Sequence, residues 1–324
     1  MSNRIYFANQ QVSFKADAGS SWTPAHGVQT VGVATSFTLE QVFELGQLAI
    51  YENIEVIPEI EMSINKVLDG YPLLYHLATA GGSTLNERLN TKCLVAVGIW
   101  PDSVDGVSDN PSQQLEASGM VISSVAYNLP IDDNFTEDIT LVGNDKAWVS
   151  SDCHTWAMAN AEGYFDPDEP DEPPSGVLRR EGFNVPASTL PSEIGVGTRD
   201  RIQNINVSLD LSRENLFELG SKRPYAKVVN FPVEVTCDIE VISISGDLIN
   251  AFAEGCPVPG FCAGRTNNTS NQSISIVCCD GTTIDLGSKN RLSSVNYGGG
   301  DAGGGNVTVS YSYITFNAFD VTQA

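Results

Sequence analysis

One short phrase occurs twice in this chain of 324 residues. VFELG at residues 42–46 returns as LFELG at residues 216–220, 174 residues later. At the same offset, nine positions between residues 29 and 58 are identical without a gap. A two-residue shift then aligns Gly70 with Gly246, and ISSVAY at 122–127 matches LSSVNY at 292–297. Because the matches keep one order, we interpret the chain as a tandem duplication of a domain of roughly 150 residues.

The boundary between the two copies is visible in the composition. Residues 161–178 contain six acidic residues and no basic one, and DPDEPDEPPSG at 166–176 is rich in proline. Proline stiffness and carboxylate repulsion favour an extended, solvated linker. A calcium site is the alternative, but this stretch lacks the ligand spacing and glycine turn of a calcium loop. We therefore expect copy one at 1–160, the linker at 161–178 and copy two at 179–324.

Both copies show the alternation of β-strands. In copy one, Ile60, Met62 and Ile64 alternate with polar residues, and Val235, Cys237 and Ile239 do so in copy two. A period of two predicts strands with one buried and one wet face. Further strands are predicted within 92–100, 119–129, 137–149, 273–279, 291–297 and 306–319. The expected fold is mainly β (α+β): two tandem β-sandwich or small-barrel domains, each with a short flanking helix.

Two short segments carry helical signals. TLEQVFELG at 38–46 has the spacing of a capping box from Thr38 to Gln41, and Gly46 stands where a helix would end. This predicts a helical turn whose Phe43 and Leu45 enter the core. GYPLLYHLAT at 70–79 places leucines at helical spacing, and it contains His76, which we interpret as a structural histidine.

No pattern typical of an enzyme emerges. The chain has three histidines, too few for an imidazole-rich metal site, and adjacency in DCHTW at 152–156 does not indicate a nucleophile–base pair. GGGDAGGG at 298–305 lacks the Lys-Ser/Thr of a phosphate-binding loop, so a flexible hairpin tip explains it better. We expect neither an enzyme nor a protein that binds a metal or another cofactor.

The seven cysteines leave three interpretations open. Cys256, Cys262, Cys278 and Cys279 cluster in copy two, but their spacing is unlike that of known zinc sites. A disulfide between Cys256 and Cys262 is the second interpretation, formed after cell lysis because the cytoplasm keeps thiols reduced. Free thiols are the default.

The charge is strongly acidic, with 40 Asp and Glu against 17 Lys and Arg, a net charge of −23. No basic stripe exists to hold phosphates, which argues against tight nucleic-acid binding. An acidic surface can still face nucleic acid that must slide past without sticking. The sequence shows no apolar run long enough to span a membrane and no secretory signal at its start, so we expect synthesis in a host cytoplasm and no membrane insertion.

Three stretches carry a resemblance to a known family. They are ADAGSSWTPAHGVQTVG at 16–32, GQLAIYENIEVIPEIEMSINKVLDGYPLLYHLAT at 46–79 and SSVAYNLPIDDNFTEDITLVGNDKAW at 123–148. The chain resembles the tail tube proteins of tailed bacteriophages. Copy two follows the same plan more loosely, with glycines replacing the acidic turn.

The resemblance implies a structural virion protein. Subunits of that family pair strands side by side into rings with sixfold symmetry, and the rings stack into a hollow tail tube through which DNA passes during ejection. A chain with two tube domains would close the ring as a homotrimer with pseudo-sixfold symmetry. Other tail proteins, such as a sheath, a baseplate or a terminator, would be its further partners.

The acidic strand faces are candidates for the tube lining, because carboxylates repel phosphates. The candidate residues are Glu59, Glu61, Glu234, Asp238 and Glu240. The alternative is that these faces form an ordinary solvated exterior. Two other functions stay open: a different tail structural protein, such as a tube terminator or baseplate hub, and a β-sandwich module for binding or adhesion.

Overall fold

The computed structural model describes residues 5, 7–16, 22–80, 82, 84–101, 111–150, 176–191, 194, 201–244, 246–251, 270–300 and 305–323. These residues form mostly strands, together with two short α-helices, α1 (Leu74–Ala78) and α2 (Leu85–Asn90). Two 3₁₀ helices, η1 (Phe7–Asn9) and η2 (Arg180–Gly182), complete the helical content. The mainly β fold expected from the alternating patterns is confirmed.

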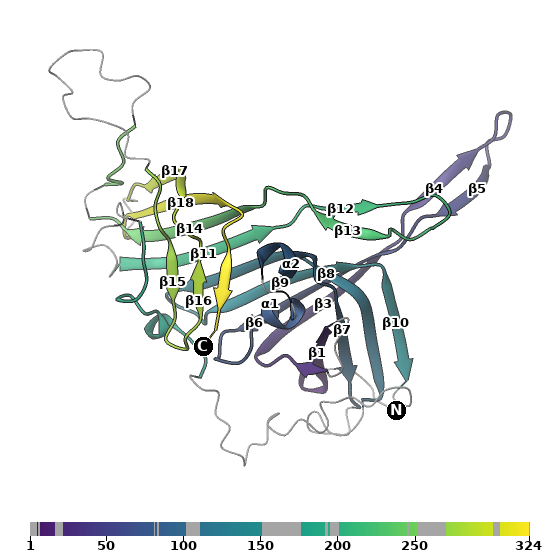
Figure 1. Ribbon diagram of the computed structural model, residues 1–324, viewed down its shortest axis with the longest axis horizontal. Coiled ribbons are helices and arrows are strands. Elements are labelled where there is room, and N and C mark those ends of the chain that lie inside the picture. The colour runs from purple at the N-terminus through teal and green to yellow at the C-terminus, as the bar shows by residue number, and fades with distance from the viewer. Residues whose placement is uncertain are drawn as a thin grey trace.

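One antiparallel sheet runs through both copies (Figure 1). Eight of its strands lie in the order β3, β6, β9, β8, β11, β14, β18, β17. The first four belong to copy one: β3 (Val28–Ser36), β6 (Glu59–Val67), β9 (Thr136–Gly143) and β8 (Gln113–Pro130). The last four belong to copy two: β11 (Ile202–Asp210), β14 (Glu234–Ile242), β18 (Thr308–Phe316) and β17 (Arg291–Gly298). Pairing between β8 and β11 therefore joins the copies into one sheet.

The remaining strands extend this sheet or project from it (Figure 1). Its four further strands are β1 (Gln10–Ala16), β2 (Thr23–Pro24), β7 (Cys93–Ile99) and β10 (Asp145–Ser150). The first half of β8 pairs with β7 and β10, whereas its second half pairs with β9 and β11. Copy two adds a small sheet of β15 (Ser275–Val277), β16 (Thr283–Asp285) and β19 (Asp320–Thr322). Two hairpins project outward: β4 (Leu39–Phe43) with β5 (Ile50–Glu55), and β12 (Arg213–Leu216) with β13 (Ala226–Val229).

The two halves of the large sheet repeat each other in register. Strand β3 pairs with β6 as β11 pairs with β14, and each first strand has an irregularity at the equivalent glutamine, Gln29 or Gln203. Strands β8 and β17 both have one at the equivalent serine, Ser123 or Ser293. Repeated register with repeated bulges agrees with the duplication that the phrases indicate. The domain boundaries themselves stay a prediction, and residues 161–175 of the linker lie outside the described part of the chain.

The core lies on one face of the large sheet. The side chains that the alternation placed inward are buried, from Ile60, Met62 and Ile64 on β6 to Val235, Cys237 and Ile239 on β14. Helix α1 contacts β1, β8 and β9, and α2 contacts β8. The opposite face carries the polar residues of the same strands, which are exposed or half-buried. Burial of the apolar face, at about 25 cal/mol per Å², is the main driving force for this arrangement.

Helix α1 is the helix predicted within residues 70–79, and a buried carboxylate holds its start. Glu137 on β9 accepts hydrogen bonds from the backbone N–H groups of Leu74 (2.6 Å) and Tyr75 (2.9 Å) and from the Tyr127 hydroxyl (2.9 Å). Burial raises the pKa of Glu137, while these hydrogen bonds act in the opposite direction. In copy two, residues 246–251 contain no helix, and 252–269 are not described.

The FELG prediction was wrong. Residues 39–43 and 213–216 are strands of the projecting hairpins, and the phrase forms the turn at each tip. Gly46 (φ +96°) and Gly220 (φ +94°) adopt the left-handed conformation that each turn requires. Leu45 and Leu219 are fully exposed rather than buried in a core. The capping-box spacing misled because a Thr-x-x-Gln pattern also fits a strand, and no core lies beneath either hairpin tip.

Candidate functional site

The two ends of the eight-stranded path are unpaired edges. Strand β3 pairs only with β6, and β17 pairs only with β18 within the described residues. Their counterparts in the other copy, β11 and β8, pair with each other. An unpaired edge presents a row of free N–H and C=O groups, which is a template for pairing with another strand. The molecule therefore contains one completed junction, and each of its two outer edges is equivalent to one strand of that junction.

The completed junction has a defined register. On its core face, Tyr127 lies opposite Val207, and Leu129 lies opposite Ile205. Hydrogen bonds extend the pairing at both ends: the Ile131 N–H donates to the Gln203 carbonyl (2.9 Å), and the Leu211 N–H donates to the Ser123 carbonyl (2.8 Å). Arg213, just beyond β11, donates from its guanidinium to the carbonyls of Ile122 and Leu89. Burial lowers the pKa of Arg213 to about 10, which leaves it charged at neutral pH.

Equivalent side chains are buried at the completed junction and exposed at the two edges. Val207 is 0% exposed, and its counterpart Val33 on β3 is 39% exposed. Tyr127 is likewise 0% exposed, whereas Tyr297 on β17 is 49% exposed. Beyond the strand, Leu211 is 1% exposed and its counterpart Phe37 is 70% exposed. The apolar side chains that would complete a second junction are thus in place and uncovered.

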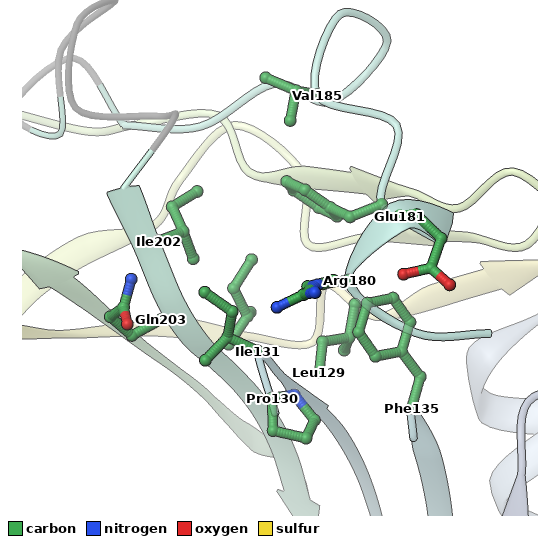
Figure 2. A pocket seen from close by; sticks show the side chains of 11 residues that line it. Leu129, Pro130, Ile131, Phe135, Arg180, Glu181, Val185, Ile202 and Gln203 are labelled. Carbon is green, nitrogen blue, oxygen red and sulfur yellow. The ribbon is translucent and has the colours of Figure 1, made fainter. Parts of the chain in front are cut away.

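A pocket opens at the completed junction. It has a volume of about 260 Å³ and lies where the end of β8, the segment 180–185 and the start of β11 meet. Figure 2 shows Ile202 and Gln203 on one side of it and Phe135 on the other. Among the described residues that line it, Glu181 is the one acidic side chain and Arg180 the one basic side chain. Its described lining is mostly apolar, and it lies between the two copies.

The polar face of the large sheet holds the five acidic residues expected to line a channel. Glu59 and Glu61 lie on β6, and Glu234, Asp238 and Glu240 lie on β14, all facing away from the core. Glu59, Glu61 and Glu234 are exposed, and Asp238 and Glu240 are half-buried. Sequence reasoning missed two further carboxylates on this face, Asp138 and Asp210. Their register to the acidic strands becomes visible only once the strand order is known.

Basic residues are nearly absent from that face. Along the eight strands, Lys66 points into the core, where its ammonium contacts Asp69 (2.6 Å). Arg291 stands at the end of β17 and donates to the Asn271 side chain (3.0 Å). The rest of the face is mostly asparagine, serine, threonine and small residues, but it also holds the larger apolar side chains of Val142, Ile314 and Phe316. A polyanion would meet a repelling, weakly hydrogen-bonding surface there.

The hairpin tips carry exposed apolar side chains. Leu45 and Leu48 extend from the β4–β5 turn, and Leu219 extends from the β12–β13 turn. Clustered exposed leucines mark a contact surface more often than a solvated tip.

The histidine and cysteines considered as candidate ligands or thiol sites have the following environments where they are described. The His76 ring nitrogen lies 2.8 Å from the Val321 carbonyl, and burial lowers its pKa. Cys278 is buried, with its pKa raised by burial to about 12, and Cys279 is exposed. Residues 152–156, Cys256 and Cys262 lie outside the described residues. In the part that is described, no group of three or more His, Cys, Asp or Glu side chains could hold a metal ion, and no helix is long and apolar enough to cross a membrane.

The comparisons with known proteins give only distant matches. No protein-family model matches the sequence, and no curated protein matches it. Among solved structures, a chain of the anti-feeding prophage baseplate matches with 10% identity and a TM-score of 0.35, covering 47% of this chain and 99% of that one. A chain of the sheath–tube complex of an extracellular contractile injection system, PVC, matches with 12% identity and a TM-score of 0.32, covering 46% and 93%.

Proposed function

We propose that the protein is a structural subunit that closes into rings through its two sheet edges, and that the rings stack into a hollow tail tube. The observation that carries this proposal is the completed junction between β8 and β11. It supplies a built example, within one chain, of the contact that β17 would make with β3 of the next chain.

The example specifies the register of the contact. Superposing β17 on β8 and β3 on β11 places Tyr297 opposite Val33 of the neighbouring chain, and Asn296 opposite its Ala34. Burial of Tyr297, Val33 and Phe37 would then reproduce the burial of Tyr127, Val207 and Leu211. Self-complementary edges that lie at opposite ends of one sheet form head-to-tail contacts, which close into rings when the rotation per subunit is suitable.

Three chains per ring fit the duplication. Each chain supplies two equivalent halves of its large sheet, so a homotrimer has six equivalent places, as the resemblance to tail tube proteins implies. Stacking then uses the hairpins, because edge pairing leaves the exposed leucines at their tips uncovered. Contact between the tips and the next ring would remove Leu45, Leu48 and Leu219 from water.

The polar sheet face is the proposed lining of the channel. Closing the sheet leaves the core, the helices and the small sheets on one side and the acidic face on the other. With Glu59, Glu61, Glu234, Asp238 and Glu240 in each chain, the lining would repel DNA phosphates. Because screening limits such repulsion to about 8 Å at physiological salt, its effect is to prevent adhesion to the wall rather than to drive transport.

The protein acts in this proposal as a conduit in a virion tail, without catalysis or a cofactor, and with other tail proteins at its ends. A tube terminator or baseplate hub would share the ring but not the unlimited stacking. Electron microscopy of the purified protein tests the proposal. The expected result is tubes built from rings of three chains; isolated rings that never stack would favour the end-protein alternative. A protein that stays monomeric at high concentration contradicts both.

A further inference from the structure

Copy two begins with a segment that fastens it to copy one. We call residues 177–182 the second strap. The Leu178 N–H donates to the Leu68 carbonyl (2.8 Å), and the Leu178 carbonyl accepts from the Phe135 N–H (2.9 Å). The Leu178 side chain is 4% exposed. A pair of backbone hydrogen bonds and one buried side chain thus hold this strap beside the β8–β11 junction.

Copy one begins with an equivalent segment, and we call its described residues, 5 and 7–9, the first strap. The two straps share an anchoring bond: the Trp100 N–H donates to the Asn9 carbonyl (2.9 Å), and the Cys279 N–H donates to the Gly182 carbonyl (2.8 Å). Aligning η1 with η2 places Ile5 at the position of Leu178 and Phe7 at the position of Arg180. Ile5 is 52% exposed and Phe7 is 88% exposed.

Copy two contains the matching receptor. In copy one, the Leu68 N–H donates to the Phe135 carbonyl, and in copy two the Ser243 N–H donates to the Val307 carbonyl, both at 2.8 Å. The Ser243 carbonyl and the Val307 N–H therefore occupy the places of the two groups that bind Leu178. Among the described residues, neither of these groups has a hydrogen-bond partner. Copy two therefore presents the equivalent pair of backbone groups, and no described segment bonds to them.

The receptor side chains of the two copies differ in size. Around the second strap, large residues of copy one, Phe135 and Leu129, line the pocket with Arg180 (Figure 2). The equivalent positions of copy two hold Val307 and Gly299, which are much smaller. The first strap has a rigid apolar ring, Phe7, where the second has the flexible, charged side chain of Arg180. The smaller receptor residues of copy two therefore leave room for an aromatic ring, whereas a flexible arginine lies beside the larger residues of copy one.

We propose that the first strap of each chain docks on copy two of its neighbour, with Ile5 bound between Ser243 and Val307 and Phe7 filling the space beside Gly299. This inference rests on the proposed side-by-side ring. It adds a second contact to each interface, made by a segment that is anchored within its own chain at Trp100 of copy one. The partner is another copy of the same chain.

Photo-crosslinking maps the contact directly. A photoreactive phenylalanine analogue replaces Ile5 in full-length chains, which are mixed as ¹⁵N-labelled and unlabelled protein and irradiated after assembly. Cross-links from position 5 to peptides containing Ser243 or Val307 of a differently labelled chain support the proposal. The same analogue at Leu178 is the control and should link to copy one of its own chain. Rings or tubes that link position 5 elsewhere contradict the strap alone; absence of any ring contradicts the proposed function and the strap together.

A size exchange tests the packing. Val307→Phe crowds Phe7 and is expected to raise the concentration needed for assembly roughly tenfold, the effect of losing one well-packed side chain. Adding Phe7→Arg recreates the Arg180 and Phe135 pair of the completed junction and should restore assembly. Melting of the unassembled protein checks that Val307→Phe still folds. Equal assembly by all three proteins, or no rescue in the double variant, contradicts the proposed packing.

Discussion

Tyr127 on β8 lies directly opposite Val207 on β11, and neither side chain is exposed to solvent. The same pair of residue types, Tyr297 and Val33, stands on the two outer edges of the sheet with 49% and 39% of each side chain exposed. The duplication thus provides one buried contact between two strands, and an exposed equivalent of each of these strands at the outer edges of the sheet. This relationship is the basis of the ring proposal.

A charge at either edge should stop assembly at the monomer. Val33→Lys places an ammonium opposite Tyr297 in a contact that would otherwise become dry, and burying an unpaired charge costs several kcal/mol. The monomer should keep its melting temperature, because Val33 is already partly exposed. Analytical ultracentrifugation measures the species present. Ring formation by Val33→Lys at the normal concentration would show that β3 is not the contact edge.

Changes at the hairpin tips should prevent the stacking of rings without preventing ring formation. Changing Leu45, Leu48 and Leu219 together to Glu leaves the sheet edges intact but places acidic groups where rings would meet. We expect single rings of unchanged mass and no tubes in negative stain. Changing the three leucines to methionine, which preserves apolar character, is the matched control and should form tubes. Tubes of normal length from the Glu variant would remove the tips from the stacking contact.

Charge reversal on the polar sheet face should make the tube adhere to DNA. Changing Glu59, Glu61, Glu234 and Glu240 to Lys should leave tubes intact, since these side chains face away from the core. Short duplex DNA should then bind the tubes at low salt and dissociate as salt rises. The four Gln changes remove repulsion without adding attraction and should bind little DNA. Tubes of the Lys variant that bind DNA only on their outer surface, as seen by cryo-electron microscopy, would place this face outside.

The buried Glu137 should be a strong stability determinant of copy one. Glu137→Val introduces the residue found at the equivalent position of copy two, Val309, but leaves the N–H groups of Leu74 and Tyr75 and the Tyr127 hydroxyl without their acceptor. Each unsatisfied buried donor costs about 1–3 kcal/mol, so a loss of roughly 3 kcal/mol or more is expected in chemical denaturation. A loss below about 1 kcal/mol would mean that water or a rearranged helix satisfies these groups.

The raised pKa of Glu137 gives its contribution a pH dependence. A carboxyl that holds its proton more tightly in the folded state stabilises the fold most below its unfolded pKa, and this advantage is lost as pH rises through the folded pKa. The stability difference between the native protein and Glu137→Gln should therefore shrink as pH rises from about 4 towards neutrality. Thermal melts of both proteins across that range measure it. A difference that grows with pH would mean that the three hydrogen bonds outweigh burial.

The sequence predicted the elements better than their assembly. Alternation identified β6 and β14, because local side-chain periodicity is determined by which face is buried. The match of ISSVAY with LSSVNY identified β8 and β17 as equivalent strands of the two copies, and both have an irregularity at the equivalent serine. The hairpins were missed because Val42, Phe43 and Leu45 suggest a buried helical face, whereas these side chains lie on a projecting arm with no core beneath it. Helix α2 was missed although Thr84 and Glu87 form a capping box that the sequence displays.

The candidate interface could not be predicted from the sequence pattern. That β8 pairs with β11, rather than each copy closing on itself, depends on strand order, which periodicity does not encode. The strap was equally hidden, since Leu178 falls at the end of an acidic linker and its partners Leu68 and Phe135 are distant in the chain. The acidic candidates Glu59 and Glu234 were found because alternation alone places them opposite a core face.

The register of β17 against β3 is the central claim, and a disulfide measures it most directly. Ala34 and Asn296 correspond to Ser208 and Ala126 of the completed junction. Ser208 and Ala126 form a non-hydrogen-bonded pair, and the Cα atoms of such pairs in antiparallel sheets lie about 4.5 Å apart. Ala34→Cys with Asn296→Cys should therefore form interchain disulfides on mild oxidation and give covalent rings on non-reducing gels. Ala34→Cys with Val295→Cys, one residue out of register and on opposite faces, should not. Equal cross-linking by both pairs, or by neither in assembled protein, would contradict the account.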